Sequence, residues 1–212
     1  MKIKKQFLFA GAMAAMFLCS CASNSIKSTW KSPEFNGKPV QKVAVLAVAE
    51  RELVRTAFEH RFANQLKKGS QPAVTTLQLL SLPEINENKE TATARLREVG
   101  ADSILITKLA GKSSYVSQAR QTHNHASTTI AGSPSDGWYT YYTVVYADAG
   151  VPRSGDRDYY VLDTSLFDLA TGKRLWSCIT ETEVKESADR LEIADDLVAK
   201  VVEQMRKDGL IR

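Results

Sequence analysis

Once its first few residues are set aside, the sequence lacks a surplus of either charge. The 212-residue chain has 28 Lys and Arg against 24 Asp and Glu, a formal net charge of +4. Three of the basic residues, Lys2, Lys4 and Lys5, lie at the amino terminus, which leaves 25 against 24 in the remainder. A nucleic-acid-binding surface needs a basic patch. We therefore expect no nucleic-acid partner.

Motifs that carry catalytic chemistry are also missing. There is no HExxH, GxSxG or dinucleotide-binding pattern. Gly132 and Gly137 have the spacing of a phosphate-binding loop, but Trp138 follows where that loop needs its lysine. Ser28 and Lys31 fit the letters SxxK without the other elements of the enzymes that use this motif. We expect a protein that is not an enzyme and needs no cofactor.

Cysteine is scarce, which excludes a domain held together by disulfides. Of the three cysteines, Cys19 and Cys21 lie near the amino terminus and Cys178 is alone in the rest of the chain. No disulfide is expected within the folded part, so its stability must come from packing. Cys178 falls in an expected strand and is predicted to be a small buried apolar side chain. An intermolecular disulfide is the alternative.

What the chain does have is an amino terminus typical of an exported protein. Lysines precede an uncharged apolar run over residues 7–18. That run is shorter than the roughly 20 apolar residues of a membrane-spanning helix, and it suits the apolar region of a signal peptide. It ends in Leu18-Cys19-Ser20-Cys21, which resembles the lipobox of bacterial lipoproteins.

The lipobox resemblance implies cleavage between Ser20 and Cys21, diacylglycerol on the Cys21 thiol, and an acyl chain such as palmitate on the new amino terminus. Two or more acyl chains give lasting membrane attachment. A secretory signal cut near Ala22, leaving an unanchored periplasmic protein, is the alternative. Ala22 is not the aspartate of an inner-membrane retention signal. In a two-membrane host we therefore expect the outer membrane, facing the periplasm, and otherwise the outer face of the cytoplasmic membrane.

Residues 1–20 are thus the expected signal peptide, and the polar residues 21–38 are expected to form a lipidated tether. Residues 39–212 have the pattern of one domain. A nearly continuous apolar run at 42–48 predicts a buried strand. Apolar residues at helical spacing, among them Leu53, Phe58 and Phe62, predict a helix over 50–68, and a second helix is expected over 88–99. Short strands are expected at 73–80 and 103–109.

Residues 111–157 are rich in Ser, Gly, Thr, Asp and Tyr and predict a long irregular excursion with one strand, at 138–146. Two β-rich runs, 159–169 and 174–184, flank a Gly-containing turn and predict a hairpin. A final helix is expected between Ser187, which can cap it, and Gly209, which ends it. The order βαβαβ, excursion, hairpin and helix predicts a single α/β domain with a mixed sheet.

Three segments of this pattern resemble a widespread group of uncharacterised bacterial envelope lipoproteins: residues 42–68, 100–105 and 168–176. More distantly, the layout is similar to the amino-terminal domain of the Tol-Pal translocation protein, the curli secretion lipoprotein, and lipoproteins that activate penicillin-binding proteins. The resemblance implies scaffolding, secretion or activation, and not catalysis. Because one fold serves many functions, it does not select among these.

Histidines are few, and only two form a pattern. His60 lies on the polar side of the first expected helix and should be solvated. His123 and His125 alternate in the excursion and point the same way if that segment is extended. A flexible loop does not by itself fix the three or four ligands of a zinc site, so no metal site is predicted.

Aromatic residues gather in one place, 138–146. The first hypothesis is a strand with one buried face whose outward tyrosines pack on neighbouring strands. The second is an exposed surface for a protein partner, with Trp138, Tyr139, Tyr141 and Tyr142 as its contact residues.

The sequence as a whole predicts a membrane-anchored envelope lipoprotein that acts as a non-catalytic protein-interaction or assembly accessory. Its expected partners are the membrane, through lipid on Cys21, and an envelope protein. The alternatives are an activator of peptidoglycan synthesis and a hydrolase that the motifs do not reveal.

Overall fold

The continuous apolar run near residue 45 forms the centre of the fold, as strand β2 (Val43–Val48), all six residues of which are buried. The computed structural model describes residues 24–49, 51–111, 137–149, 159–183 and 190–212. Val43, Val45 and Ala47 point to one hydrophobic cluster, and Ala44, Leu46 and Val48 point to a second on the opposite face. A strand with both faces covered has no polar side, which explains its continuous apolar sequence.

The sheet around β2 has six strands in the order β1-β6-β5-β4-β2-β3. β2 runs parallel to β3 (Ala73–Thr75) and to β4 (Ser103–Gly111). The other neighbours are antiparallel: β4 with β5 (Tyr159–Asp168), β5 with β6 (Arg174–Glu183), and β6 with β1 (Asn24–Lys31). The predicted α/β fold with a mixed sheet is confirmed.

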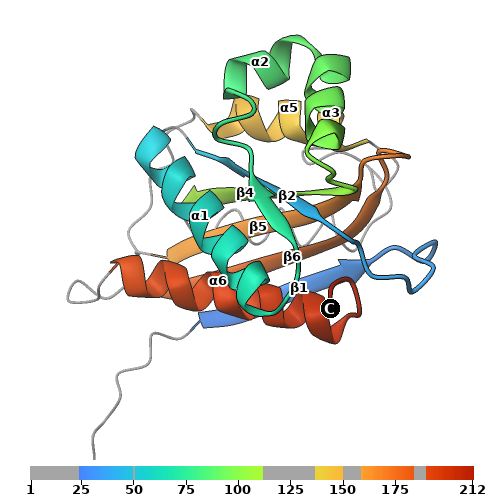
Figure 1. Cartoon of the computed structure of the whole chain (residues 1–212). Coiled ribbons are helices and arrows are strands. Elements are labelled where there is room, and N and C mark those ends of the chain that lie inside the picture. The colour runs from blue at the N-terminus through green and yellow to red at the C-terminus, as the bar shows by residue number, and fades with distance from the viewer. Residues whose placement is uncertain (1–23, 50, 112–136, 150–158, 184–189) are drawn as a thin grey trace, which may run out of the picture.

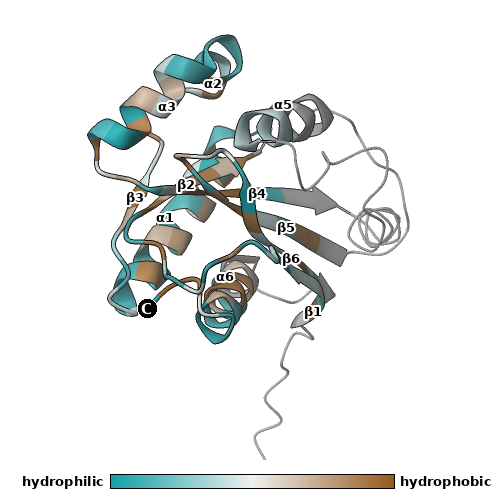
Figure 2. Cartoon of the chain, turned by 90° about the vertical axis from the view of Figure 1, so that its right-hand side faces the viewer, coloured by the Kyte–Doolittle hydropathy of each residue, from teal (hydrophilic) through white to brown (hydrophobic). Residues whose placement is uncertain are grey.

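Helices cover both faces of the sheet, in three layers (Figures 1 and 2). One cluster joins the strands to α1 (Glu52–Lys68) and α6 (Arg190–Lys207). The other joins them to α2 (Leu82–Glu87), α3 (Lys89–Glu98) and α5 (Trp138–Ala149). Along the chain, α1 connects β2 to β3, and α2 and α3 connect β3 to β4 on the opposite face.

The predicted helix ends and the hairpin turn follow from local chemistry. Gly209 has a φ of 75°, in the left-handed region, and its N–H donates to the Arg206 carbonyl just past the end of α6. Gly172, with a φ of 74°, makes the turn between β5 and β6, and its N–H donates to the Asp168 carbonyl. Glycine adopts this region without the steric penalty that other residues meet.

The expected tether at 21–38 is the largest difference from the sequence interpretation. Residues 24–31 are the edge strand β1, paired with β6 from Asn24 opposite Thr182 to Lys31 opposite Trp176. The segment is polar, but its backbone hydrogen-bonds to an otherwise open sheet edge, and this tertiary pairing outweighs its weak strand propensity. Phe35 packs against the core, as predicted for the end of this segment.

Two other segments also differ. The strand expected over 73–80 is only Ala73–Thr75, because the chain turns at Thr76, whose N–H donates to the Glu59 carboxylate. The strand expected over 138–146 is helix α5. Helix α2 had no counterpart in the sequence interpretation, although Ser81 and Glu84 form a capping box before and within its first turn.

Candidate functional site

The end of the sheet at which the parallel strands β2, β3 and β4 finish is called here the carboxyl edge. Because β1 is antiparallel to β6, β6 to β5, and β5 to β4, strand β1 begins at this same edge. The predicted cleavage and lipidation residues, Ser20 and Cys21, lie outside the described residues. Only Ala22 and Ser23 separate Cys21 from the first residue of β1 in the sequence. The carboxyl edge is therefore the part of the domain next to the predicted anchor.

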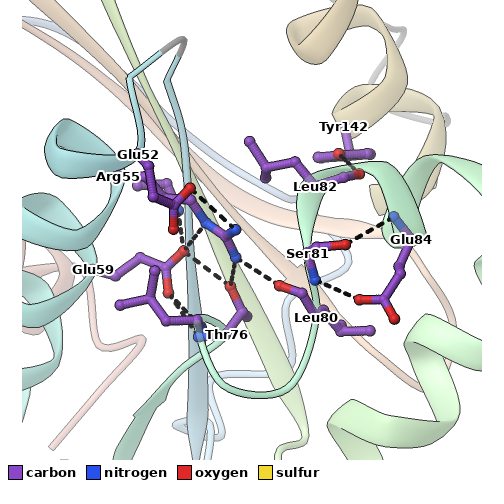
Figure 3. Close-up of polar contacts among 11 residues, drawn as sticks. Glu52, Arg55, Glu59, Thr76, Leu80, Ser81, Leu82, Glu84 and Tyr142 are labelled. Atoms are coloured by element: carbon purple, nitrogen blue, oxygen red, sulfur yellow. Dashed lines mark hydrogen bonds and ion pairs between the residues drawn. The ribbon is translucent and has the colours of Figure 1, made fainter.

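A buried ion pair, Arg55 with Glu59, lies at the carboxyl edge (Figure 3). The Arg55 Nε lies 2.9 Å from the Glu59 Oε1, and the Arg55 Nη2 donates to the Leu80 carbonyl at 2.8 Å. The Glu59 Oε1 also accepts from the Ala47 N–H at 3.2 Å and the Thr76 hydroxyl at 3.0 Å. Its Oε2 accepts from the N–H groups of Thr76 and Leu77, at 2.7 and 3.1 Å.

This arrangement joins α1, the end of β2 and the turn after β3. Glu59 is fully buried, and burial raises the pKa of its carboxyl above the usual 4.5, although Arg55 and the hydrogen bonds to it act in the opposite direction. A carboxylate has about four lone-pair positions, and five donors already occupy them. The Glu59 carboxylate therefore holds the backbone in place and has no free oxygen with which to act on a substrate.

The aromatic segment lies on α5, with one side toward the core. Trp138, Tyr141 and Tyr142 are each at most 1% exposed, and Tyr139 is half-buried. The Tyr141 ring packs on Phe167 with 5.2 Å between centroids. The hydroxyls of Tyr139 and Tyr142 each donate at 2.6 Å to backbone carbonyls, those of Asn86 and Leu82.

Burial at these positions corrects the hypothesis of an exposed aromatic surface. Three of the four proposed contact residues, Trp138, Tyr141 and Tyr142, belong to the cluster between α5, α3 and the sheet. Burial raises the pKa of the Tyr141 phenol well above its usual 10.0; the Asp163 carboxylate raises it further, and the Arg174 guanidinium, 5.0 Å from the ring centroid, lowers it. A partner would have to displace α5 to reach these rings.

Cys178 is a fully buried thiol on β6, as predicted. Burial, with smaller contributions from the Asp163 and Asp208 carboxylates, raises its pKa to about 12. The thiolate is the reactive form, so we expect a maleimide to label native protein slowly and denatured protein completely. Rapid labelling of native protein, or a dimer band that disappears on reduction, would show that this thiol is accessible.

The histidines divide as the sequence allows. His60 is exposed on α1, as predicted. His123 and His125 lie outside the described residues. Within the described ranges, no three His, Cys, Asp or Glu side chains gather closely enough to hold a metal ion.

A cavity of about 370 Å³ opens at the opposite end of the sheet, between residues 32–41 and the β5–β6 turn. Its carboxylates bind the protein's own backbone: Asp102 accepts from the N–H groups of Gln41 and Lys42 at 2.7 and 3.0 Å. Asp168 accepts from the Thr171 N–H at 2.6 Å. These groups close loops, and they assign no ligand chemistry to the cavity.

The helices of the described ranges show no combination of length and apolar character sufficient to cross a bilayer.

Sequence reasoning missed the Arg55–Glu59 pair and the position of β1. The i, i+4 spacing of Arg55 and Glu59 would have indicated a helical ion pair, but not that its partners come from β2 and from the turn after β3. Trp138, Tyr141 and Tyr142 are spaced i, i+3, i+4, which is a helical signal.

No protein-family model matches this chain, and neither does any curated protein sequence. Among solved structures, it is similar to the PelC dodecamer from Paraburkholderia phytofirmans, with a TM-score of 0.48, 15% identity, and coverage of 89% of this chain and 99% of that chain. A variant of that PelC in another space group gives 0.46, 16%, 86% and 96%. Lipoprotein GNA1162 from Neisseria meningitidis gives 0.42, 12%, 78% and 96%. These likenesses are too remote to carry a function to this chain.

Proposed function

We propose that this chain is an envelope lipoprotein, anchored by lipid on Cys21, whose α/β domain is a non-catalytic module for protein interaction or assembly close to that membrane. The observation that carries the proposal is the position of β1. The strand starts three residues after the lipobox cysteine and is part of the sheet. Lipid and folded domain are then directly connected.

This short connection bears on the alternative of an activator of peptidoglycan synthesis. The expected tether of about 20 residues could extend to roughly 70 Å, but the three steps from Cys21 to Asn24 extend to only about 11 Å. A domain of this length is about 40 Å across. An activator on the outer membrane must reach a synthase in the inner membrane. The geometry favours a partner near the anchoring membrane.

The hydrolase alternative has little support in the described polar groups. The Glu59 carboxylate is saturated by its own chain, and the cavity carboxylates Asp102 and Asp168 hold backbone N–H groups. Turnover of a generic ester or of peptidoglycan by the purified protein would overturn the non-catalytic proposal. Co-purification of the intact lipoprotein from its native membrane would identify the partner.

Cys21→Ala is expected to abolish membrane attachment and labelling by palmitate, whereas Cys19→Ala should retain both. Each acyl chain contributes about 0.8 kcal/mol per buried CH₂, so removal of all chains leaves no lasting anchor. Fractionation of cells fed labelled palmitate tests both variants together. Palmitate on the Cys21→Ala protein would mean that the anchor is elsewhere. Separation of the two membranes tests the outer-membrane location, and Ala22→Asp should move the protein to the inner one.

A further inference from the structure

Two large apolar side chains of the described residues are exposed, and both lie at the carboxyl edge. Leu53 in the first turn of α1 is 71% exposed, and Ile26 near the start of β1 is 36% exposed. Leu53 was expected in the apolar stripe of its helix. It lies nine residues before Phe62, which at 3.6 residues per turn places it on the opposite side of α1. Nothing in the core of the domain explains a leucine there.

The starts of β1, α1 and α6 lie together on the left of Figure 1. Six strands spaced about 4.8 Å apart make this edge about 24 Å long from β1 to β3. The start of β1 is within about 11 Å of Cys21 along the chain. An acylated Cys21 at the membrane surface therefore keeps one end of this edge at the bilayer, and Leu53 lies toward the other end.

We propose that the carboxyl edge of the sheet rests against the lipid bilayer and that Leu53 enters the bilayer interface. The inference rests on the lipid anchor proposed above and adds the orientation of the domain. Leucine is favourable in an apolar environment, and apolar side chains on a surface helix bind membranes by burial at the headgroup boundary. In this orientation the cavity beside the β5–β6 turn faces away from the membrane.

The described charges near Leu53 and Ile26 are balanced. Arg51 and Glu52 are both exposed at the start of α1. Lys27 on β1 lies 3.7 Å from Glu181 on β6. Balanced charges give little attraction to anionic lipids. The contact is therefore apolar, and it should persist at high salt.

The test uses the full lipidated protein with Leu53→Cys, labelled with an environment-sensitive fluorophore. Cys178 is buried with a pKa of about 12 and does not compete for the label. The matched control is Lys68→Cys, exposed at the other end of the same helix and about 22 Å further along its axis. Both proteins are placed in vesicles of phosphatidylethanolamine and phosphatidylglycerol, with and without brominated acyl chains.

The expected result is a blue shift at position 53, with quenching by the brominated lipid that high salt leaves unchanged. Position 68 should show neither effect, and Ile26→Cys should behave like position 53. Protein that floats with the vesicles but shows no quenching at position 53 overturns the orientation and leaves the anchor intact. A blue shift that depends on protein density without quenching indicates contact between copies, and also overturns it. Protein that fails to float removes the anchor itself.

Discussion

Glu59→Ala is expected to lower the free energy of unfolding by about 3–5 kcal/mol, because it leaves the Arg55 guanidinium buried without its counter-charge. It also removes the acceptor of the N–H groups of Ala47, Thr76 and Leu77. Buried donors without acceptors add to the loss. Chemical denaturation followed by far-UV circular dichroism measures the change.

A second ion pair on α1 provides the control. The Arg61 Nε lies 2.8 Å from the Asp195 Oδ1, but the Asp195 side chain is 65% exposed. Asp195→Asn is expected to change stability by less than about 1 kcal/mol, as exposed ion pairs do. Equal effects of the two substitutions would mean that Glu59 is solvated and does not hold the turn after β3.

The pH dependence of Arg55→Met gives a further check on the same pair. The pKa of Glu59 in the folded protein lies above the 4.5 of the unfolded chain, so the folded state binds this proton more readily. Its contribution to stability therefore grows as the pH falls through the folded pKa toward 4.5, and is absent well above the folded pKa. Removal of Arg55 raises the folded pKa further. The destabilisation by Arg55→Met should be larger at pH 8 than at pH 5.

Trp138→Ala is expected to cost about 3–5 kcal/mol, the range for a large aromatic lost from a core. Trp138 is 1% exposed and packs edge-on against Tyr139. For a domain of this size, that loss lowers the melting temperature by roughly 6–20 °C. Calorimetry or a thermal melt followed by circular dichroism measures it.

Thr140→Ala is the control on the same helix, because Thr140 is exposed, and it should leave the melting temperature nearly unchanged. In a pull-down, capture of any partner by the Trp138→Ala protein should follow the fraction folded. A native melting temperature combined with lost capture would restore Trp138 as a contact residue.

The elements that could be predicted from sequence are those whose pattern is set by the core they touch. β2 carries an uninterrupted apolar run because both its faces are covered. In α6, Ala194, Val198, Val201 and Met205 recur at helical spacing, because one side packs on the sheet. The turn at Gly172 and the stop at Gly209 rest on the backbone conformation that glycine permits.

The elements that could not be predicted depend on partners distant in the sequence. β1 is polar, and it is a strand because β6, about 150 residues later, offers an edge. The α5 segment has the aromatic and β-branched composition of a strand, but its burial against α3 and the sheet requires a helix. The candidate site combines Glu59, β2 and the turn after β3, and a sequence pattern along one helix does not reveal the other two.

The direction of β1 determines how the domain bears mechanical load. When the chain is anchored through Cys21, a pull between the membrane and a partner at the far end of the sheet enters at Asn24 and runs along the strand. The hydrogen bonds between β1 and β6 are perpendicular to that pull, so the ladder is loaded in shear and its bonds share the force. A ladder pulled from the side would open one bond at a time. The same strand that links the lipid to the sheet is therefore oriented to resist being stripped from it.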